Sequence, residues 1–241
     1  MRRLLGAIQF LTIIPVRTAA APPGEAALFF PLVGAALGWV GGKCFSLLEP
    51  RLGAALAALL LLGLWALVTG GLHEDGLADI ADALRAHRSR SKMMGILKDS
   101  RIGAFGALAL IVILAVRWQA IVRMGPEPAA ELAACLALSR AALVAQAYVS
   151  RPLGDGLGAA FAARLSTPTA IVALAEGVGA AFLPGARQGA ALLSGAVFLT
   201  WLLNRWFDAR LGGVNGDCLG GTSLLVETFC MVIVSCRDCS L

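Results

Sequence analysis

The chain has 241 residues, of which 59% are hydrophobic and only 15% are charged, and its mean hydropathy is +0.81. Soluble domains usually carry about a quarter charged residues, so this composition excludes an ordinary soluble domain. The net charge of +5 is explained by contact with anionic lipid headgroups, and no nucleic-acid partner is expected.

The first 22 residues combine a basic start, an apolar stretch and an end rich in small residues, as a secretory signal does. Arg17 interrupts the apolar stretch, however, and the next apolar run follows almost at once. We therefore expect an interfacial or re-entrant helix near the cytoplasmic surface rather than a cleaved signal.

Seven apolar segments follow, and the first four approach the roughly 20 residues that a helix needs to cross a bilayer. They cover residues 29–48, 52–72, 103–122, 130–149, 169–183, 188–204 and 219–235. Their apolar residues are continuous rather than alternating, which favours helices over strands. The sequence predicts an all-α polytopic integral membrane helical bundle with about seven transmembrane helices, and residues 1–241 form a single membrane-embedded catalytic domain.

The basic residues predict the orientation of this bundle. With the N-terminus in the cytoplasm, segments 73–101, 150–168 and 205–217 are cytoplasmic as well. Fourteen of the twenty Lys and Arg residues then lie on this side, if Arg140 is placed at the inner end of its helix. The other six are Lys43, Arg51, Arg117, Arg123, Arg187 and Arg237. This bias agrees with the positive-inside rule.

Segment 73–101 carries the most informative polar residues, because Glu74, Asp75, Asp79, Asp82 and Asp99 are five of the fifteen acids of the chain. If residues 74–84 are helical, each residue turns the helix by about 100°. Asp75, Asp79 and Asp82 then form one stripe opposite an apolar face, and Glu74 lies beside the stripe at the helix start.

Three carboxylates at this spacing repel one another, and no basic residue lies between them. A bound hard cation relieves such repulsion, and Mg²⁺ is commonly held by one or two carboxylates together with substrate phosphates. We therefore predict a Mg²⁺ site formed by the acidic stripe with Glu74, and the alternative is an acidic cytoplasmic face without special chemistry. The metal-site hypothesis requires the three stripe side chains to share one pocket.

Three further clusters are expected on the same side of the membrane. In "KDSRIGAFG", Lys98, Asp99 and Arg101 precede a glycine-rich helix start, a combination that binds phosphate oxygens. The segment "SRAALVAQAYVSRPLGDGLGAAF" contributes Arg140 and Arg151. In "LGGVNGDCLGG", Asp217 is positioned to cap the last helix, and the glycines allow close approach of a ligand or another helix.

These motifs together resemble the cobalamin (5′-phosphate) synthase family, the adenosylcobinamide-GDP ribazoletransferases. The resemblance rests on six blocks in the family's order: "AIQFLTIIPV", "FFPLVGAALG", "GGLHEDGLADIADAL", "ILKDSRIGAFG", "LSRAALVAQAYVSRPLGDGLGAAF" and "LGGVNGDCLGG". The sequence departs from the family pattern at Ala83, Asn215, Cys218 and Gly221, and in the run "SLLVE", where the family has more polar residues.

The resemblance implies a Mg²⁺-dependent transferase of the cell inner (cytoplasmic) membrane, with its active site on the cytoplasmic side. It would join adenosylcobinamide-GDP to α-ribazole or its 5′-phosphate and release GMP. Asp75, Asp79 and Asp82, with Glu74, would hold the metal, and Asp82 is our choice for the general base. Lys98, Asp99, Arg101, Arg140, Arg151 and Asp217 would bind substrate and its phosphates. The sequence leaves a homo-oligomer open.

Two other functions remain open on the residues alone. A CDP-alcohol phosphotransferase also clusters Asp residues on membrane helices, but its signature spreads them over about twenty residues. A cation-coupled transporter would place acids at midspan in two related halves. Here the acids crowd one cytoplasmic segment, and Glu176 is the only acid placed clearly inside a late span.

Overall fold

The structure, a computed structural model, describes residues 1–17, 19–83, 89–97, 99 and 101–236. Within these ranges the regular structure is helical, and the only β contact is an isolated bridge between Pro152 and Val214. The helices are α1 (Arg2–Leu11), α2 (Pro23–Ala26), the 3₁₀ helix η1 (Ala27–Phe29), α3 (Phe30–Leu52), α4 (Ala54–Thr69), α5 (Leu72–Ala83), α6 (Arg90–Ile96), α7 (Ala104–Met124), α8 (Ala129–Val149), α9 (Leu157–Ala163), α10 (Thr167–Ala181), α11 (Ala186–Leu211) and α12 (Gly216–Ser235).

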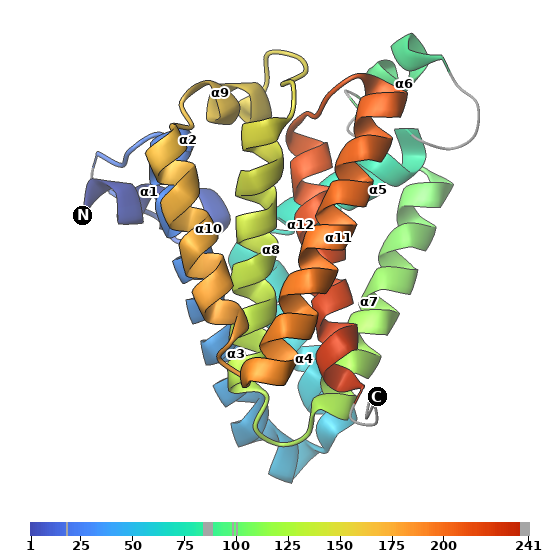
Figure 1. Ribbon diagram of the computed structural model, residues 1–241. Helices are drawn as coiled ribbons and strands as arrows, with labels where there is room; N and C mark the ends of the chain where they lie inside the picture. The colour runs from blue at the N-terminus through green and yellow to red at the C-terminus, as the bar shows by residue number, and fades with distance from the viewer. Residues whose placement is uncertain (18, 84–88, 98, 100, 237–241) are drawn as a thin grey trace.

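Five helical segments among the described residues are long and apolar enough to cross a membrane, and two bent helix pairs raise the number to as many as seven. The all-α polytopic fold is therefore confirmed. In the bent pairs, α5 turns by 91° from α4, and α10 turns by 105° from α9. The short helices α5 and α9 consequently lie across one end of the bundle, and we treat them as outside the membrane-spanning segments (Figure 1).

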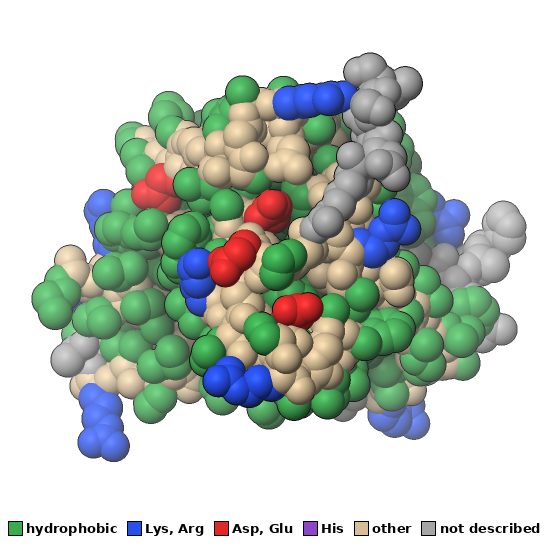
Figure 2. All heavy atoms as spheres, turned by 90° about the horizontal axis from the view of Figure 1, so that it is seen from below, with side chains coloured by type: hydrophobic (Ala, Val, Ile, Leu, Met, Phe, Trp, Pro, Cys, Tyr) green, Lys and Arg blue, Asp and Glu red, His purple; other side chains and the backbone are tan. Residues whose placement is uncertain are grey.

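The same end of the bundle, which we call the α5 end, also holds α1, α2 and α6 (Figure 1). The segments predicted to share one side of the membrane are thus on one side of the fold. The opposite end consists of the short connections after α3, α7 and α10, and Figure 2 views the molecule from there. Its surface is mostly apolar side chains and backbone, with scattered charged residues.

Helix α8 lies at the centre of the bundle, and α3 packs closely against it. Gly34, Gly38 and Gly42 follow one another at four-residue intervals on α3. A Cβ at Gly34 would lie 2.6 Å from the carbonyl oxygen of Leu136, and one at Gly38 would overlap the carbonyl of Leu132. Small residues at this spacing let two membrane helices approach each other closely, so this stripe fixes α3 against α8.

Candidate active site

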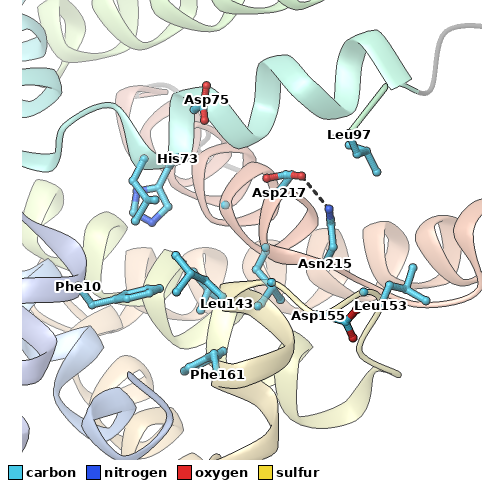
Figure 3. Close-up of a pocket in the computed structure, with 18 of the residues that line it drawn as sticks. Phe10, His73, Asp75, Leu97, Leu143, Leu153, Asp155, Phe161, Asn215 and Asp217 are labelled. Carbon is cyan, nitrogen blue, oxygen red and sulfur yellow. Dashed lines mark hydrogen bonds between the residues drawn. The ribbon is translucent and has the colours of Figure 1, made fainter. Parts of the chain in front are cut away.

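Two cavities at the α5 end meet at Asp75. The first, which we call the Asp217 cavity, has a volume of about 400 Å³. Figure 3 shows Asp75 of α5 and Asp217 of α12 on one side of it, with Phe10 and Phe161 on the other. The second, the Asp79 cavity, has a volume of about 620 Å³ and contains Asp75, Asp79 and the turn between α4 and α5. Both volumes lie within the range of small-molecule sites.

Asp217 faces the first cavity because another residue caps its helix. The N-cap of α12 is Asn215, whose Oδ1 accepts from the backbone N–H of Cys218 at 3.0 Å. The Asn215 amide donates in turn to Asp217 at 2.7 Å. The prediction that Asp217 caps the last helix was therefore wrong. An Asn cap leaves the Asp217 carboxylate in the cavity, close to Asp75.

The pKa of Asp79 reflects the negative charges of the neighbouring carboxylates. Partial burial, followed by the charges of Asp217, Asp75 and Asp82, raises the pKa of Asp79 from 3.8 to about 6. The carboxylates therefore repel one another across the junction of the two cavities. The predicted helix is confirmed as α5, and the repulsion expected from the spacing of its acids is present, with Asp217 adding a contribution from α12.

Asp82 has different surroundings from the other two stripe residues. Its carboxylate accepts from the backbone N–H of Gly103 at 2.7 Å and of Gly106 at 3.0 Å. These are free N–H groups at the start of α7, so Asp82 joins α5 to that helix. The requirement that all three stripe carboxylates share one pocket is therefore not met: Asp75 and Asp79 both line the Asp79 cavity, whereas both oxygens of Asp82 are engaged by the backbone.

Glu74 turns away from the stripe into the bundle. It accepts from Arg117 of α7 at 3.0 Å. Arg117 also pairs with Glu227 of α12, and Glu227 pairs with Arg140 of α8. Glu227 is 2% exposed, so this is a buried network of two acids and two arginines that links four helices. Glu74 consequently has a partner other than a metal in this structure, and it anchors α5 beside the position of Asp75.

This network contradicts the predicted positions of two arginines. Arg140, 2% exposed, donates to Ser139 and Glu227 rather than facing a cytoplasmic phosphate. Arg117 was counted among the residues at the opposite end, but it is 3% exposed within the bundle. Glu227 was missed, although a Glu inside an apolar span, with an Arg inside another span, is a signal for a buried ion pair.

The remaining phosphate-binding candidates lie on exposed segments. Arg101 forms a two-point ion pair with Asp99, through Nη2 at 2.8 Å and Nε at 3.0 Å. This pairing lowers the pKa of Asp99. Lys98 lies outside the described residues. Arg151 is exposed, and its backbone carbonyl accepts from Val214 at 2.9 Å, which brings its loop next to the loop before α12.

Glycines let these segments approach closely, and Gly221 belongs to the cluster for which the sequence predicted this. A Cβ at Gly76 of α5 would lie 2.9 Å from the carbonyl oxygen of Asp217. A Cβ at Gly158 of α9 would lie 2.5 Å from the backbone nitrogen of Gly216. At Gly221 of α12 a Cβ would lie 2.5 Å from the side chain of Ile80. The absence of side chains therefore brings α5, α9 and α12 together around the Asp217 cavity.

The donor set fits Mg²⁺ that completes its coordination with substrate oxygens. Among the residues that the structure describes, no three His, Cys, Asp or Glu side chains are grouped closely enough to hold a metal ion. Mg²⁺, however, keeps several waters and needs only one or two carboxylates besides substrate phosphates. Asp75 and Asp79 supply two carboxylates that line one cavity.

Comparisons with known proteins identify the family of this chain. The family model for cobalamin-5-phosphate synthase matches residues 3–235. Proteins named adenosylcobinamide-GDP ribazoletransferase from Geotalea daltonii and Stutzerimonas stutzeri are 35% and 41% identical, with 96% and 97% of both chains covered. The protein of that name from Klebsiella pneumoniae is 39% identical over 82% of both chains. No solved structure matches the chain significantly. This chain belongs to the cobalamin-5-phosphate synthase family.

Proposed function

We propose that this protein is an adenosylcobinamide-GDP ribazoletransferase, with Asp75 at the centre of its site. The observation that carries the proposal is the position of Asp75 at the junction of two cavities, with Asp79 in one and Asp217 in the other. Two substrates can then meet at one carboxylate cluster. Membership of the family and the names of the close relatives support this activity.

In the proposed reaction, a hydroxyl of α-ribazole or its 5′-phosphate attacks the phosphorus attached to the cobinamide side of the diphosphate. The bond between that phosphorus and the oxygen of the leaving GMP breaks, and the attacking hydroxyl loses its proton to a base. Asp75 and Asp79 would hold Mg²⁺, which supplies neutralisation of the diphosphate charge when bound. Asp217 is placed to orient the acceptor or its proton at the same junction.

Lys98, Arg101 and Arg151 remain proposed phosphate contacts, and Arg101 would exchange Asp99 for a phosphate oxygen. Asp82 remains a proposed metal ligand and base, but its two backbone hydrogen bonds favour a role in holding α5 against α7. We further propose that the α5 end faces the cytoplasm across the cell inner membrane. The concentration of Lys and Arg in the segments at this end supports that orientation.

The test is GMP release by purified protein from adenosylcobinamide-GDP, α-ribazole and Mg²⁺. Asp75→Asn and Asp79→Asn each remove one negative charge without changing side-chain size, and we expect either change to reduce GMP release by about 10²-fold or more. Asp208→Asn is the matched control, because Asp208 is exposed on α11 outside both cavities. It should retain wild-type turnover.

Removing Mg²⁺ with a chelator should abolish turnover, and adding it back should restore turnover. Full activity of both Asp75→Asn and Asp79→Asn in correctly inserted protein would refute the assigned site. Absence of GMP with folded wild-type protein would refute the proposed reaction itself.

A further inference from the structure

A third cavity opens on the side of the bundle between α8, α10 and α11, away from the active-site cavities. Its volume is about 290 Å³. In Figure 1, α10 and α11 are joined at the opposite end and diverge toward the α5 end, with α8 between them. The rim consists of exposed apolar residues, among them Val197 and Trp201, at 60% and 58% exposure. These helices span the membrane, so the cavity faces lipid.

Gln146 of α8 lines this apolar cavity and carries an unsatisfied amide. Its side chain is 0% exposed, yet neither Nε2 nor Oε1 has a hydrogen-bond partner among the described residues. A buried amide without partners costs free energy comparable to lost hydrogen bonds, and it is rare in folded proteins. A bound molecule with hydrogen-bonding groups would remove this cost.

The polar residues of the cavity lie toward one end of it along the membrane normal, where the apolar Val149 and Trp201 also line it. Gln146, Thr200 and Asn204 lie toward the α5 end of their helices. Leu138, one of the deep apolar residues, lies eight positions before Gln146, which is about 12 Å along the helix axis. The exposed Arg205 follows Asn204 directly and places a cation at the polar end.

This arrangement of polar residues suits an amphiphilic molecule whose headgroup lies at the α5 end. Trp201 and Trp206 are exposed at that level of α11, as aromatic residues commonly are at a membrane interface. A phospholipid ester carbonyl would accept from the Gln146 amide, while its acyl chain fills the apolar part. A headgroup with hydroxyl donors would satisfy Oε1, and a negative phosphate would complement Arg205.

We propose that the cavity between α8, α10 and α11 binds one anionic glycerophospholipid, held at Gln146. The proposal is independent of the transferase activity, because none of these residues lines the active-site cavities. The lipid would fill the space between the diverging helices and thereby stabilise their packing.

The test uses the full chain in detergent, with phosphatidylglycerol as the probe and phosphatidylcholine as the comparison lipid. Native mass spectrometry counts retained lipid, and thermal unfolding measures stabilisation. Wild type should retain one phosphatidylglycerol, and its Tm should rise more with this lipid than with phosphatidylcholine. Gln146→Leu removes the unsatisfied amide at similar volume. It should raise the Tm without lipid but weaken phosphatidylglycerol binding by about five- to tenfold.

Ala145→Trp places a bulky side chain in the cavity and should abolish retention. Ile111→Trp is the control, since Ile111 is 64% exposed on α7, far from this cavity. It should retain lipid as wild type does. Equal Tm gains in wild type and Gln146→Leu, or lipid retention by Ala145→Trp, would overturn the proposal. A dimer that forms without lipid and dissociates on Ala145→Trp would also overturn it, because a second copy would then occupy the cavity.

Discussion

Removing the negative charge of Glu227 should strongly destabilise this membrane bundle. In Glu227→Gln, Arg140 loses its acidic partner and keeps Ser139 as its one hydrogen-bond partner among the described residues, while Arg117 still has Glu74. Breaking a buried pair by removing one partner costs about 3–5 kcal/mol, because the other charge is left uncompensated. Gln keeps the size and an acceptor oxygen, so we expect a loss of about 3 kcal/mol, at the lower end of this range.

The measurement is reversible unfolding in mixed micelles with increasing SDS, followed by circular dichroism. The matched control is Glu127→Gln, which affects an exposed pair with Lys43 at 3.0 Å. Exposed pairs contribute about 0–1 kcal/mol, so the control should unfold close to wild type.

A double-mutant cycle separates the effect of charge from that of packing. Adding Arg140→Gln to Glu227→Gln removes the uncompensated cation, and the double variant should be more stable than Glu227→Gln alone. The two changes should thus be strongly non-additive. Additive effects, or wild-type stability of Glu227→Gln, would refute the conclusion that this network neutralises buried charge.

Three further predictions follow from single contacts. In Asp82→Asn, the side chain can accept a hydrogen bond from only one of the two N–H groups at the start of α7. The free energy of unfolding in the same SDS titration should therefore fall by about 1–2 kcal/mol. An unchanged midpoint would contradict the capping role. Asp79→Asn should raise the Tm at pH 7.5, because the folded protein holds the Asp79 proton more tightly, with a pKa of about 6 against 3.8. Ionised Asp79 therefore opposes folding at neutral pH, and the Tm difference should shrink as the pH falls from above 6 to below 4; a constant difference would show that the charge is not involved. Gly38→Ala should destabilise the α3–α8 contact. The control is Gly63→Ala, where a Cβ meets no atom within 4 Å, and this change should be neutral or stabilising by about 0.5–1 kcal/mol. Equal midpoints of the two variants in the SDS titration would contradict the close packing.

Local patterns in the sequence were sufficient to predict the helical architecture. Apolar length predicted the spanning segments, and the spacing of Asp75, Asp79 and Asp82 predicted the amphipathic helix α5. The side on which each polar segment lies followed from the alternation of spans and loops. These features are set within one turn of helix or one crossing of the bilayer, so the neighbouring residues along the chain determine them.

The partner of each polar side chain was decided only by the tertiary structure. Glu74 and Asp75 are adjacent in sequence, yet one joins a buried ion network and the other lies at the junction of two cavities. Asp82 binds the start of α7, and Asn215 takes the cap that would otherwise have engaged Asp217. A carboxylate near a helix start can accept from its own backbone, a distant arginine or a metal ion. Which of these it meets depends on how α5, α7, α8 and α12 pack, and that packing brings together groups separated by more than a hundred residues.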